Sequence, residues 1–291
     1  MSDGVASAGP GAQPALTGAL LSLVDALDRR FVAMAARWGA VEYRFGPLLD
    51  ARVVERVDWL RSFPHLATFP VVLDAEEANL EGFAAGEPLD GEGRVTLGRP
   101  GPVYEVLAPA ACYHLYAHHE GRHLEGAHYL TVRNTCFRRE ASYAPLERQW
   151  AFTMREIVCL GSAADTSAFV AEATDEILRL VAAWGLRATW VHATDPFFRP
   201  ARDPRSLMQL VDPTKHELQL ESGLAVASTN LHHDHFGRAF SITLAGGADL
   251  GRGVEPARSA CVAFGLERWL AAFVSRFGAD GPWPDVEADH G

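Results

Sequence analysis

The sequence lacks the features of a secreted or membrane-embedded protein. Its start is rich in Gly, Ala, Ser and Pro but has neither the basic residues nor the apolar run of a secretory signal. Charged residues, Gly or Pro interrupt every apolar stretch before it reaches the roughly 20 residues that span a bilayer. We therefore predict a cytoplasmic protein without membrane contact, with a disordered tail over residues 1–14 and a single domain over residues 15–285.

Cysteines and basic residues are also scarce. Four cysteines, at positions 112, 136, 159 and 261, are too few and too scattered for a disulfide framework, and none forms a CxxC pair. We expect reduced thiols or metal ligands. The 26 basic residues face 37 acidic ones, and the formal net charge is −11. Because phosphate contacts need cations to displace counterions, this charge argues against a general nucleic-acid binder.

The chain is long enough for a sizeable core, with 291 residues of which 48% are apolar and 22% charged. Apolar spacing predicts helices over residues 15–38, 50–61 and 165–184, the last with Asp165 as its cap. Residues 262–277 fit a strand that turns into a final helix. Further strands are expected over residues 71–73, 129–137, 149–160, 188–192, 217–220, 223–228 and 239–244, and hairpins or loops over residues 81–101. This pattern predicts an α+β fold, with an antiparallel sheet flanked by helices.

The stretch from His119 to His123 matches HExxH. On a helix, this motif places two imidazoles on one face beside a general-base Glu, as in zinc peptidases. The match is short for a chain with 12 histidines, Tyr129 stands where a third ligand would be, and Gly121 weakens a helix by roughly 1 kcal/mol. A metallopeptidase using His119, Glu120 and His123 is an alternative, and we favour a His-rich polar helix surface.

A second histidine cluster spans His232-His-Asp-His235. Alternation along a strand would place His233 and His235 on one face, which is one arrangement for a metal site. Adjacent residues rarely converge on one ion, so we favour a strand or turn that lines a polar pocket.

Two blocks of sequence suit nucleotide binding. In the first, Cys136-Phe-Arg-Arg-Glu140 is followed by a loop and then by Arg148-Gln-Trp-Ala-Phe152. A mononucleotide needs a cation at its α-phosphate, an acceptor for the adenine amino group and an aromatic face for the ring. The second block, Cys261-Val-Ala-Phe-Gly-Leu-Glu-Arg268, is a strand-to-helix junction in which a glycine permits close approach of the backbone. Either block alone would be a weak signal, since an Arg- and Glu-rich hairpin is usually a salt-bridged surface.

Together these blocks resemble motifs 2 and 3 of the class II aminoacyl-tRNA synthetases. The resemblance implies the antiparallel catalytic core of that class and an ATP-binding site. In it, Arg138 holds the α-phosphate, Glu140 reads the adenine amino group and Phe152 stacks on adenine. Arg148 and Arg268 reach the γ-phosphate, and Arg138 and Arg268 are the implied catalytic residues.

Within that class, the stretch from Pro145 to Gly161 is similar to the seryl-tRNA synthetases of methanogenic archaea. Those enzymes hold an active-site zinc with two Cys and one Glu. The resemblance implies Zn²⁺ on Cys112, Glu156 and Cys261, with a fourth position open for the α-amino group of the substrate. The other two cysteines are expected to pack as small buried hydrophobes.

The resemblance covers about residues 50 to 280 and lacks the tRNA-binding domain of those synthetases. In this respect the chain is similar to the amino acid:[carrier protein] ligases. That family implies ATP-dependent, AMP-forming activation of glycine or L-alanine, and transfer to the phosphopantetheine thiol of a carrier protein. Ser228 and Asn230 would line the amino-acid pocket. With its net charge of −11 the chain is expected not to bind tRNA, and a seryl-tRNA synthetase-like enzyme that charges tRNA is the alternative.

The same resemblance leads to expectations about Mg²⁺ and assembly. No acidic residue occupies the usual Mg²⁺ position before motif 3, so Glu217 and Glu221 are the candidates for that ion and for ATP contact. Motif 1, which joins class II dimers around a proline, has its counterpart at Pro64 or Pro70. We therefore expect a homodimer.

The segment over residues 197–208 carries arginines at positions 199, 202 and 205. Carrier proteins of this type are usually acidic, so an acidic enzyme needs a local cationic surface to bind one. The segment is therefore a candidate docking surface. The alternative is a solvated loop whose arginines pair with Asp195 and Asp203.

Overall fold

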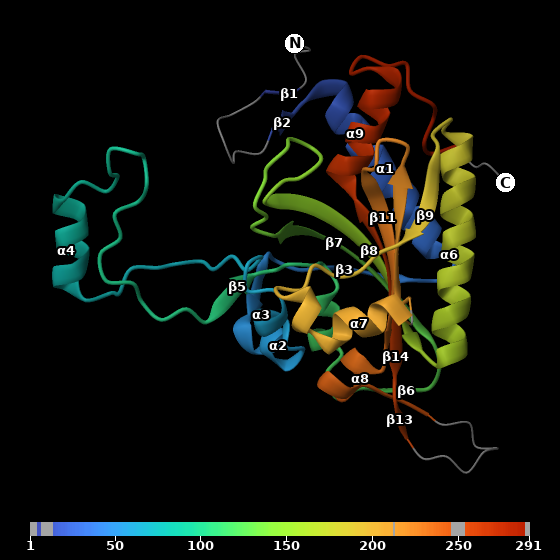
Figure 1. Cartoon of the computed structure of the whole chain (residues 1–291), viewed down its shortest axis with the longest axis horizontal. Coiled ribbons are helices and arrows are strands. Elements are labelled where there is room, and N and C mark those ends of the chain that lie inside the picture. Colours follow the sequence, from blue (N-terminus) through green and yellow to red (C-terminus); the bar gives the residue numbers. More distant parts are fainter. Residues whose placement is uncertain (1–4, 7–13, 212, 246–253, 289–291) are drawn as a thin grey trace.

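The computed structural model describes residues 5–6, 14–211, 213–245 and 254–288. Its centre is a seven-stranded sheet in the order β3-β7-β8-β14-β11-β10-β9 (Figure 1). Neighbouring strands are antiparallel except for β3 and β7 at one edge, which are parallel. The strands are β3 (Val41–Arg44), β7 (His128–Phe137), β8 (Ala151–Gly161), β9 (Ala188–His192), β10 (Lys215–Leu220), β11 (Ala225–His233) and β14 (Arg258–Gly265).

One face of the sheet is covered by long amphipathic helices. They are α1 (Gly18–Ala36), α6 (Ala163–Ala183) and α9 (Leu266–Phe277). Phe31 of α1 stacks on Phe264 of β14 with ring centroids 3.9 Å apart, and Trp184 and Trp269 are buried beside them. Each helix packs with its apolar stripe against the sheet and leaves its polar side outward. The predicted antiparallel α+β fold is confirmed.

The other face of the sheet carries a second apolar cluster built on short helices. These are α2 (Ala51–Arg56), α3 (Trp59–Ser62), α5 (Tyr113–His118) and α8 (His235–Ala239). Side chains alternate along a strand, so Ile157 of β8 packs in the first cluster while Val158 packs in the second. Tyr116 of α5 stacks on Phe236 of α8 with centroids 3.9 Å apart. Helix α7 (Pro204–Val211) borders the space between this cluster and the sheet.

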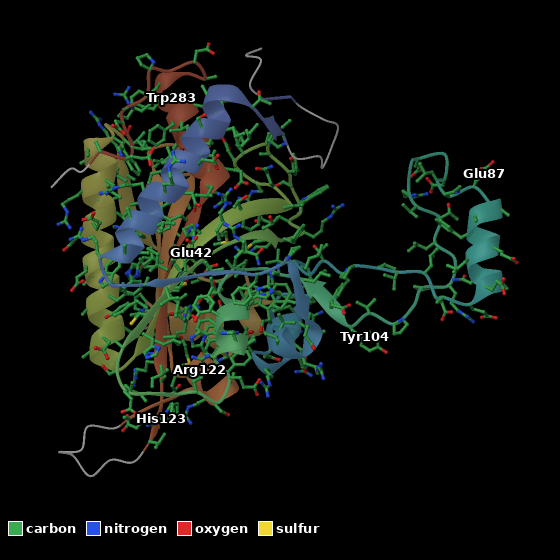
Figure 2. The ribbon with its side chains drawn as sticks, turned by 180° about the vertical axis from the view of Figure 1, so that it is seen from behind. Glu42, Glu87, Tyr104, Arg122, His123 and Trp283 are labelled. Atoms are coloured by element: carbon green, nitrogen blue, oxygen red, sulfur yellow. The ribbon has the colours of Figure 1, made fainter. Side chains whose placement is uncertain are left out.

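Residues 74–104 form an arm that projects away from the rest of the molecule (Figures 1 and 2). The arm carries α4 (Glu77–Ala85), none of whose residues is buried. Within the arm, the Asn79 side chain donates hydrogen bonds to the backbone oxygens of Asp74 and Arg99. The arm is therefore held together by its own polar contacts rather than by a core.

Short strands complete the described structure. β1 (Val5–Ala6) pairs with β2 (Ala15–Leu16), β4 (Leu48–Asp50) pairs with β5 (Glu105–Leu107), and β12 (Thr243–Leu244) lies between β6 (His123–Leu124) and β13 (Glu255–Pro256). A 3₁₀ turn, Pro200–Arg202, precedes α7. Among the described residues, no helix is both long and apolar enough to cross a membrane.

Several predicted helix boundaries were wrong. The helix expected over residues 50–61 begins correctly after Asp50, whose side chain caps it, but it breaks into α2 and α3 because Asp58 adopts a left-handed conformation with a φ of 55°. The N-cap of α6 is Ser162, and Asp165 is the reciprocal partner of a capping box. The predicted tail over residues 1–14 lies mostly outside the described residues, although β1 falls within it.

Three segments adopt a different structure from the predicted one. The strand expected over residues 239–244 is replaced by the end of α8, a turn and β12, because a short apolar run does not by itself distinguish strand from helix. Residues 81–101, predicted as hairpins and loops, include part of α4. Residues 71–73 form an isolated bridge between Leu73 and Pro100 instead of a strand.

Candidate active site

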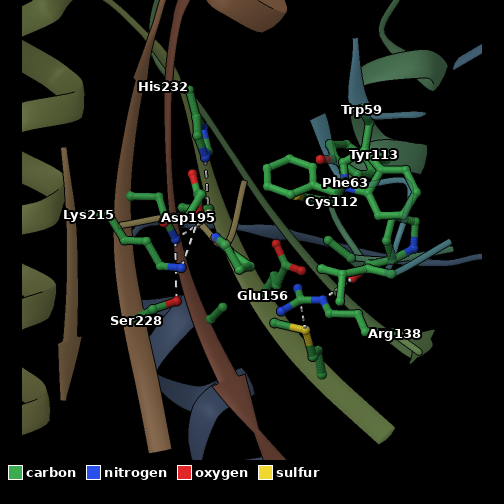
Figure 3. A pocket seen from close by; sticks show the side chains of 18 of the residues that line it. Trp59, Phe63, Cys112, Tyr113, Arg138, Glu156, Asp195, Lys215, Ser228 and His232 are labelled. Carbon is green, nitrogen blue, oxygen red and sulfur yellow. Dashed lines mark hydrogen bonds and ion pairs between the residues drawn. The ribbon is translucent and has the colours of Figure 1, made fainter. Parts of the chain in front are cut away.

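A pocket of about 890 Å³ lies between the second apolar cluster and the central strands. In Figure 3, Lys215, Ser228 and His232 stand on one side of it, and Tyr113 and Arg138 face them from the other. The residues predicted for ATP, amino acid or metal line this pocket, except Arg148 of motif 2 and Glu221, the second candidate for Mg²⁺. The structure therefore brings together residues that are as much as 156 positions apart (112 to 268).

The predicted metal ligands meet at one point of the pocket. Cys112 precedes α5, Glu156 comes from β8 and Cys261 from β14, and their ligand atoms all lie within 4.8 Å of one another in a buried position. The Ala111 N–H donates to Glu156 Oε1 at 2.8 Å and fixes that carboxylate. In the described part of the chain, no other group of His, Cys, Asp and Glu meets this distance criterion. Two thiols and one carboxylate fit zinc, with a fourth position left open.

The electrostatics of this group suit a cation. Burial and the charge of Cys261 raise the pKa of Glu156 to about 7. The hydrogen bond shared by the two thiols, together with burial, raises the pKa of Cys112, and the same bond lowers the pKa of Cys261. Buried acidic groups that oppose one another's ionisation are a favourable place for a divalent ion, which would neutralise them.

The motif 2 residues lie on β7 and β8 and in the loop between them. Arg138 donates from Nε to the Pro109 oxygen at 2.8 Å, and its guanidinium lies 5.4 Å from the centre of the Phe152 ring. Both side chains line the pocket, as predicted for an adenine nucleotide. Glu140 and Arg148 form an ion pair with each other, and Arg148, unlike Glu140, does not line the pocket.

Arg268 of motif 3 enters the pocket from the start of α9. Its guanidinium donates to the backbone oxygens of Glu147 at 2.7 Å and Ala225 at 3.1 Å. Burial lowers the pKa of Arg268, and the nearby charges of Arg138 and Arg148 lower it further. Neighbouring arginines whose charges repel one another are stabilised when a polyanion, such as the phosphates of ATP, binds between them.

Glu267 is a pocket residue that the sequence interpretation missed. Both of its carboxylate oxygens accept the Thr153 N–H, each at 2.9 Å, and burial raises its pKa. It ties α9 to β8 beside the predicted nucleotide residues. Its place directly before Arg268, inside the motif 3 block, was the signal that could have identified it.

The predicted amino-acid residues connect to the metal group. The Asn230 side chain donates from Nδ2 toward Ser228 Oγ at 3.3 Å and toward Cys261 Sγ at 3.4 Å. Strand register explains this, because Asn230 of β11 pairs directly with Cys261 of β14. Asn230 therefore lies next to Cys261, and Ser228 lies next to Asn230.

A polar cluster around Lys215 was also missed. Lys215 is the only lysine in the sequence, and its Nζ lies 3.0 Å from Asp195 Oδ1 and 3.4 Å from Glu217 Oε1. Gln209 of α7 donates to Asp195 Oδ2 at 2.9 Å. Burial opposes ionisation of Asp195, yet the charge of Lys215 holds its pKa below the usual range. Glu217, the candidate for Mg²⁺, lines the pocket within this cluster, and Glu221 pairs instead with Arg187.

The HExxH stretch does not form a peptidase-like site. Helix α5 ends at His118, and Gly121 has a left-handed φ of 72°, so His119 and His123 do not share a helical face. His119 is buried, with its Nδ1 2.8 Å from the Leu115 oxygen, whereas His123 is exposed on β6 near the edge of the molecule (Figure 2). Glu120 pairs with Arg56. This segment is neither a metal site nor the continuous helix surface that we expected.

The second histidine cluster lines the pocket, in agreement with the preferred interpretation. It runs from the end of β11 through a turn into α8. His232, rather than His233 or His235, is the member that touches a predicted metal ligand, with Nε2 3.7 Å from Cys261 Sγ.

The sheet, its motif 2 and motif 3 strands and the pocket between them define the catalytic core of a class II aminoacyl-tRNA synthetase. The M. kandleri seryl-tRNA synthetase, solved in complex with A. aeolicus tRNASec, superposes with a TM-score of 0.76 at 19% identity. The match covers 97% of this chain and 57% of that chain. At this identity the likeness establishes the fold alone.

Sequence relatives are more specific. No protein-family model matches the chain. Amino acid--[acyl-carrier-protein] ligase 2 of Bradyrhizobium diazoefficiens is 34% identical over 254 residues, which are 84% of this chain and 73% of that protein. The type-2 serine--tRNA ligase of Methanothermobacter thermautotrophicus is 27% identical over 91% of this chain but only 53% of its own length. The chain therefore belongs to the amino acid--[acyl-carrier-protein] ligase family and is a ligase.

Proposed function

We propose that this chain uses ATP to activate glycine or L-alanine as an aminoacyl-adenylate and transfers it to the phosphopantetheine thiol of a carrier protein. The observation that carries the proposal is one pocket in which the group Cys112, Glu156 and Cys261 lies beside Arg138 and Arg268. Such a pocket offers one subsite for an amine and another for a nucleotide. The carrier protein as acceptor is supported by the name of the 34% identical relative. A reaction that consumes ATP suits the predicted cytoplasmic location.

The residues of the pocket suggest how the first step proceeds. With adenine on Phe152, Arg138 would bind the α-phosphate and offset the charge that develops as the substrate carboxylate attacks the α-phosphorus. The new bond joins a carboxylate oxygen to phosphorus, and the bond to the bridging oxygen breaks. Pyrophosphate would leave toward Arg268, with Arg148 as the second cation. A thiolate then attacks the carbonyl carbon of the mixed anhydride, and AMP leaves.

The metal and the remaining polar residues would select the amino acid. Zn²⁺ on the group of Cys112, Glu156 and Cys261 would supply a Lewis-acidic position for a free α-amino group. Ser228 and Asn230 would border the rest of the amino acid. Mg²⁺ would arrive with ATP, and Glu217 is the proposed protein contact for it.

Amino-acid-dependent exchange of pyrophosphate into ATP tests this function. We expect exchange with glycine, L-alanine or both when all twenty amino acids are supplied with Zn²⁺ and Mg²⁺. If none supports exchange, the ligase activity is wrong. The acceptor is tested separately by offering the adenylate either a phosphopantetheine-bearing carrier protein or tRNA. Labelling of tRNA alone would favour the alternative, a seryl-tRNA synthetase-like enzyme.

We further propose that α7 and the turn before it form the carrier docking surface. Leu207, Met208 and Phe198 are more than half exposed there, next to the exposed Arg199 and Arg202. Apolar residues rimmed by cations suit an acidic partner.

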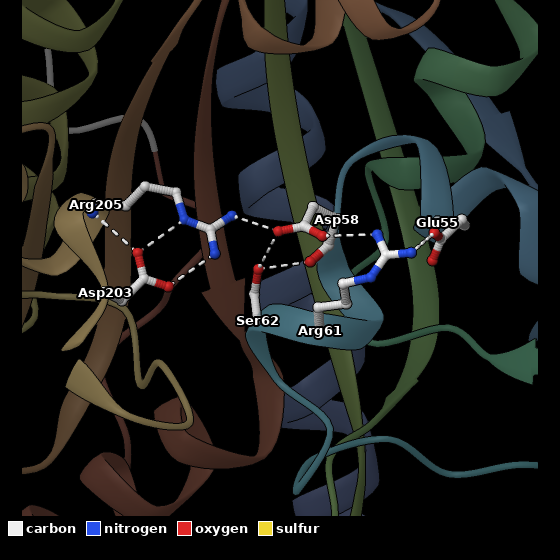
Figure 4. Close-up of polar contacts among 6 residues, drawn as sticks. All are labelled: Glu55, Asp58, Arg61, Ser62, Asp203 and Arg205. Atoms are coloured by element: carbon white, nitrogen blue, oxygen red, sulfur yellow. Dashed lines mark hydrogen bonds and ion pairs between the residues drawn. The ribbon is translucent and has the colours of Figure 1, made fainter.

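Arg205 has a different role from the predicted one. It pairs with Asp203 and with Asp58 of the α2–α3 region, which in turn contacts Ser62 (Figure 4). An arginine held in this way anchors α7 to the body of the protein. Arg199 and Arg202 are therefore the arginines of this surface that we expect to contact a carrier protein.

Reversing the charge of these two arginines tests the docking surface. The double change Arg199→Glu and Arg202→Glu should lower kcat/KM for transfer to the carrier by about tenfold at low salt and weaken its salt dependence, because steering by opposite charge is lost. Pyrophosphate exchange should not change. The matched control reverses Arg44 and Arg122, exposed arginines on β3 and before β6. Equal loss of transfer in both double variants would mean that overall charge, not this surface, is responsible.

We also propose that the chain forms a homodimer through residues 69–72 at the base of the arm. Phe69, Val71 and Val72 are exposed around Pro70, one of the two prolines predicted for motif 1, and a contiguous apolar strip of this kind usually contacts a partner. Val71→Glu with Val72→Glu should convert a dimer to a monomer in sedimentation velocity at micromolar concentration. Leu80→Glu, an exposed apolar residue of α4, is the control that should stay dimeric. A monomeric unmodified chain would contradict the proposal.

A further inference from the structure

The imidazole of His232 touches the proposed metal group without belonging to it. Its Nε2 lies 3.7 Å from Cys261 Sγ, and its Nδ1 lies 3.1 Å from Ser259 Oγ and 3.3 Å from the Tyr116 hydroxyl. His232 is not among the residues whose ligand atoms all lie within 4.8 Å of one another. Its place is therefore next to a ligand and outside the ligand set.

The neighbours of the ring fit one placement of its hydrogen. Two hydroxyl groups lie beside Nδ1, and a hydroxyl can donate to an unprotonated ring nitrogen or accept from a protonated one. With the hydrogen on Nε2, the ring donates toward the Cys261 sulfur while Nδ1 accepts from a hydroxyl. Ser259 and Tyr116 are both buried, so the arrangement is held by packed groups rather than by solvent.

The backbone aims His232 at this position. The pairing of β11 with β14 shifts register between Leu231 and His233, and His232 is left without a partner in the ladder. Such a bulge redirects a side chain and is common beside active sites. Two residues earlier, the Asn230 side chain also points an N–H at Cys261 Sγ, at 3.4 Å. One thiol of the metal group thus receives two N–H donors.

We propose that His232 is a positioning residue of the metal centre, whose imidazole donates its Nε2–H to the Cys261 sulfur alongside Asn230. The inference rests on the proposed function, because it requires the metal. Donors outside a ligand set orient the ligand and adjust its electron donation. Here they would hold the sulfur in place and withdraw charge from it, which leaves the open metal position a better acceptor for an amine.

Metal titration tests this role without measuring catalysis. The metal-free protein is titrated with Zn²⁺ against a chelator and, separately, with Co²⁺, whose thiolate charge-transfer band reports electron donation by sulfur. His232→Leu should weaken zinc binding by about 10- to 100-fold, as loss of an outer partner does, and move the cobalt band to longer wavelength. His232→Gln can place an amide N–H near the same point. It should restore most of the zinc affinity and most of the original wavelength of the cobalt band. Ser259→Ala removes a partner of Nδ1. It should change the zinc affinity and the cobalt band in the same direction as His232→Leu does, by a smaller amount.

The controls separate this inference from the proposed function. His235→Leu alters another histidine of the pocket, none of whose described contacts reaches Cys261, and should leave both titrations unchanged. Zinc affinity and a cobalt band in His232→Leu equal to those of the unmodified chain would overturn the inference while leaving the metal centre intact. A change of cobalt coordination number in that variant would overturn it too, in favour of His232 as a direct ligand. An unmodified chain that binds neither metal would refute the zinc site itself.

Discussion

Replacing Arg138 with alanine is expected to lower kcat for pyrophosphate exchange by about 10²- to 10³-fold, the usual cost of losing one donor to a developing charge. The guanidinium lies 5.4 Å from the centre of the Phe152 ring, and both side chains line the pocket proposed for the nucleotide. Its interaction would strengthen as the α-phosphate gains charge, so the loss should appear mainly in kcat rather than in KM for ATP. Exchange kinetics over a range of ATP concentrations separate the two parameters.

The neighbouring arginine provides the control. Arg139 places its guanidinium 3.4 Å from the centre of the Trp150 ring and does not line the pocket. Arg139→Ala should therefore retain most of the exchange activity. Arg138 also bonds the Pro109 oxygen, close to Cys112, so metal content must be measured in the Arg138 variant. Full exchange activity in Arg138→Ala would remove it from the catalytic site.

Replacing Cys112 or Cys261 with serine should reduce bound zinc from one ion per chain to nearly none. Each change removes a thiolate from a set of three ligands, so the effect should exceed the about 10- to 100-fold loss that follows from an outer partner. Amino-acid recognition should disappear with the metal, whereas ATP should still bind, because the proposed adenine contacts come from Glu140 and Phe152. Metal analysis of the purified variants and ATP titration measure the two effects.

The other cysteines are matched controls. Cys136 and Cys159 are buried free thiols like Cys112 and Cys261, but neither belongs to the proposed metal group. Their serine variants should keep full zinc, at some cost in stability from burying a hydroxyl. Zinc retained in both Cys112→Ser and Cys261→Ser would refute the ligand assignment.

The resemblance of short blocks led to most of the site because their geometry is local. Arg138 directly follows β7, and Phe152 lies on β8, the antiparallel neighbour of β7, while Gly265 ends a strand where α9 begins. The spacing along the chain therefore already implies the spacing in space. The metal ligands could be assigned only through that resemblance. No local pattern joins Cys112 to Cys261, which are 149 positions apart (261 − 112).

Pairings between charged side chains were predicted least well. Arg205, a candidate for contact with a carrier, pairs with Asp203, as the alternative expected, and also with Asp58, which was not expected. Glu140 and Arg148 were given separate nucleotide contacts and form an ion pair. An exposed charged side chain can form ion pairs of similar energy with many partners, and its sequence neighbours do not predict which partner the fold brings close.

By itself, the sequence determined the antiparallel core with its helices, and it carried the motifs from which a nucleotide site is predicted, because apolar periodicity and strand-turn-strand spacing act over a few residues. Tertiary structure alone decided that the arm leaves the body, that His232 rather than His119 or His123 approaches the metal group, and that Lys215 lies between Asp195 and Glu217. These contacts depend on strand register, on a bulge and on segments far apart in the chain. The physical reason is that such contacts arise from the packing of the whole domain, and no single stretch of sequence specifies them.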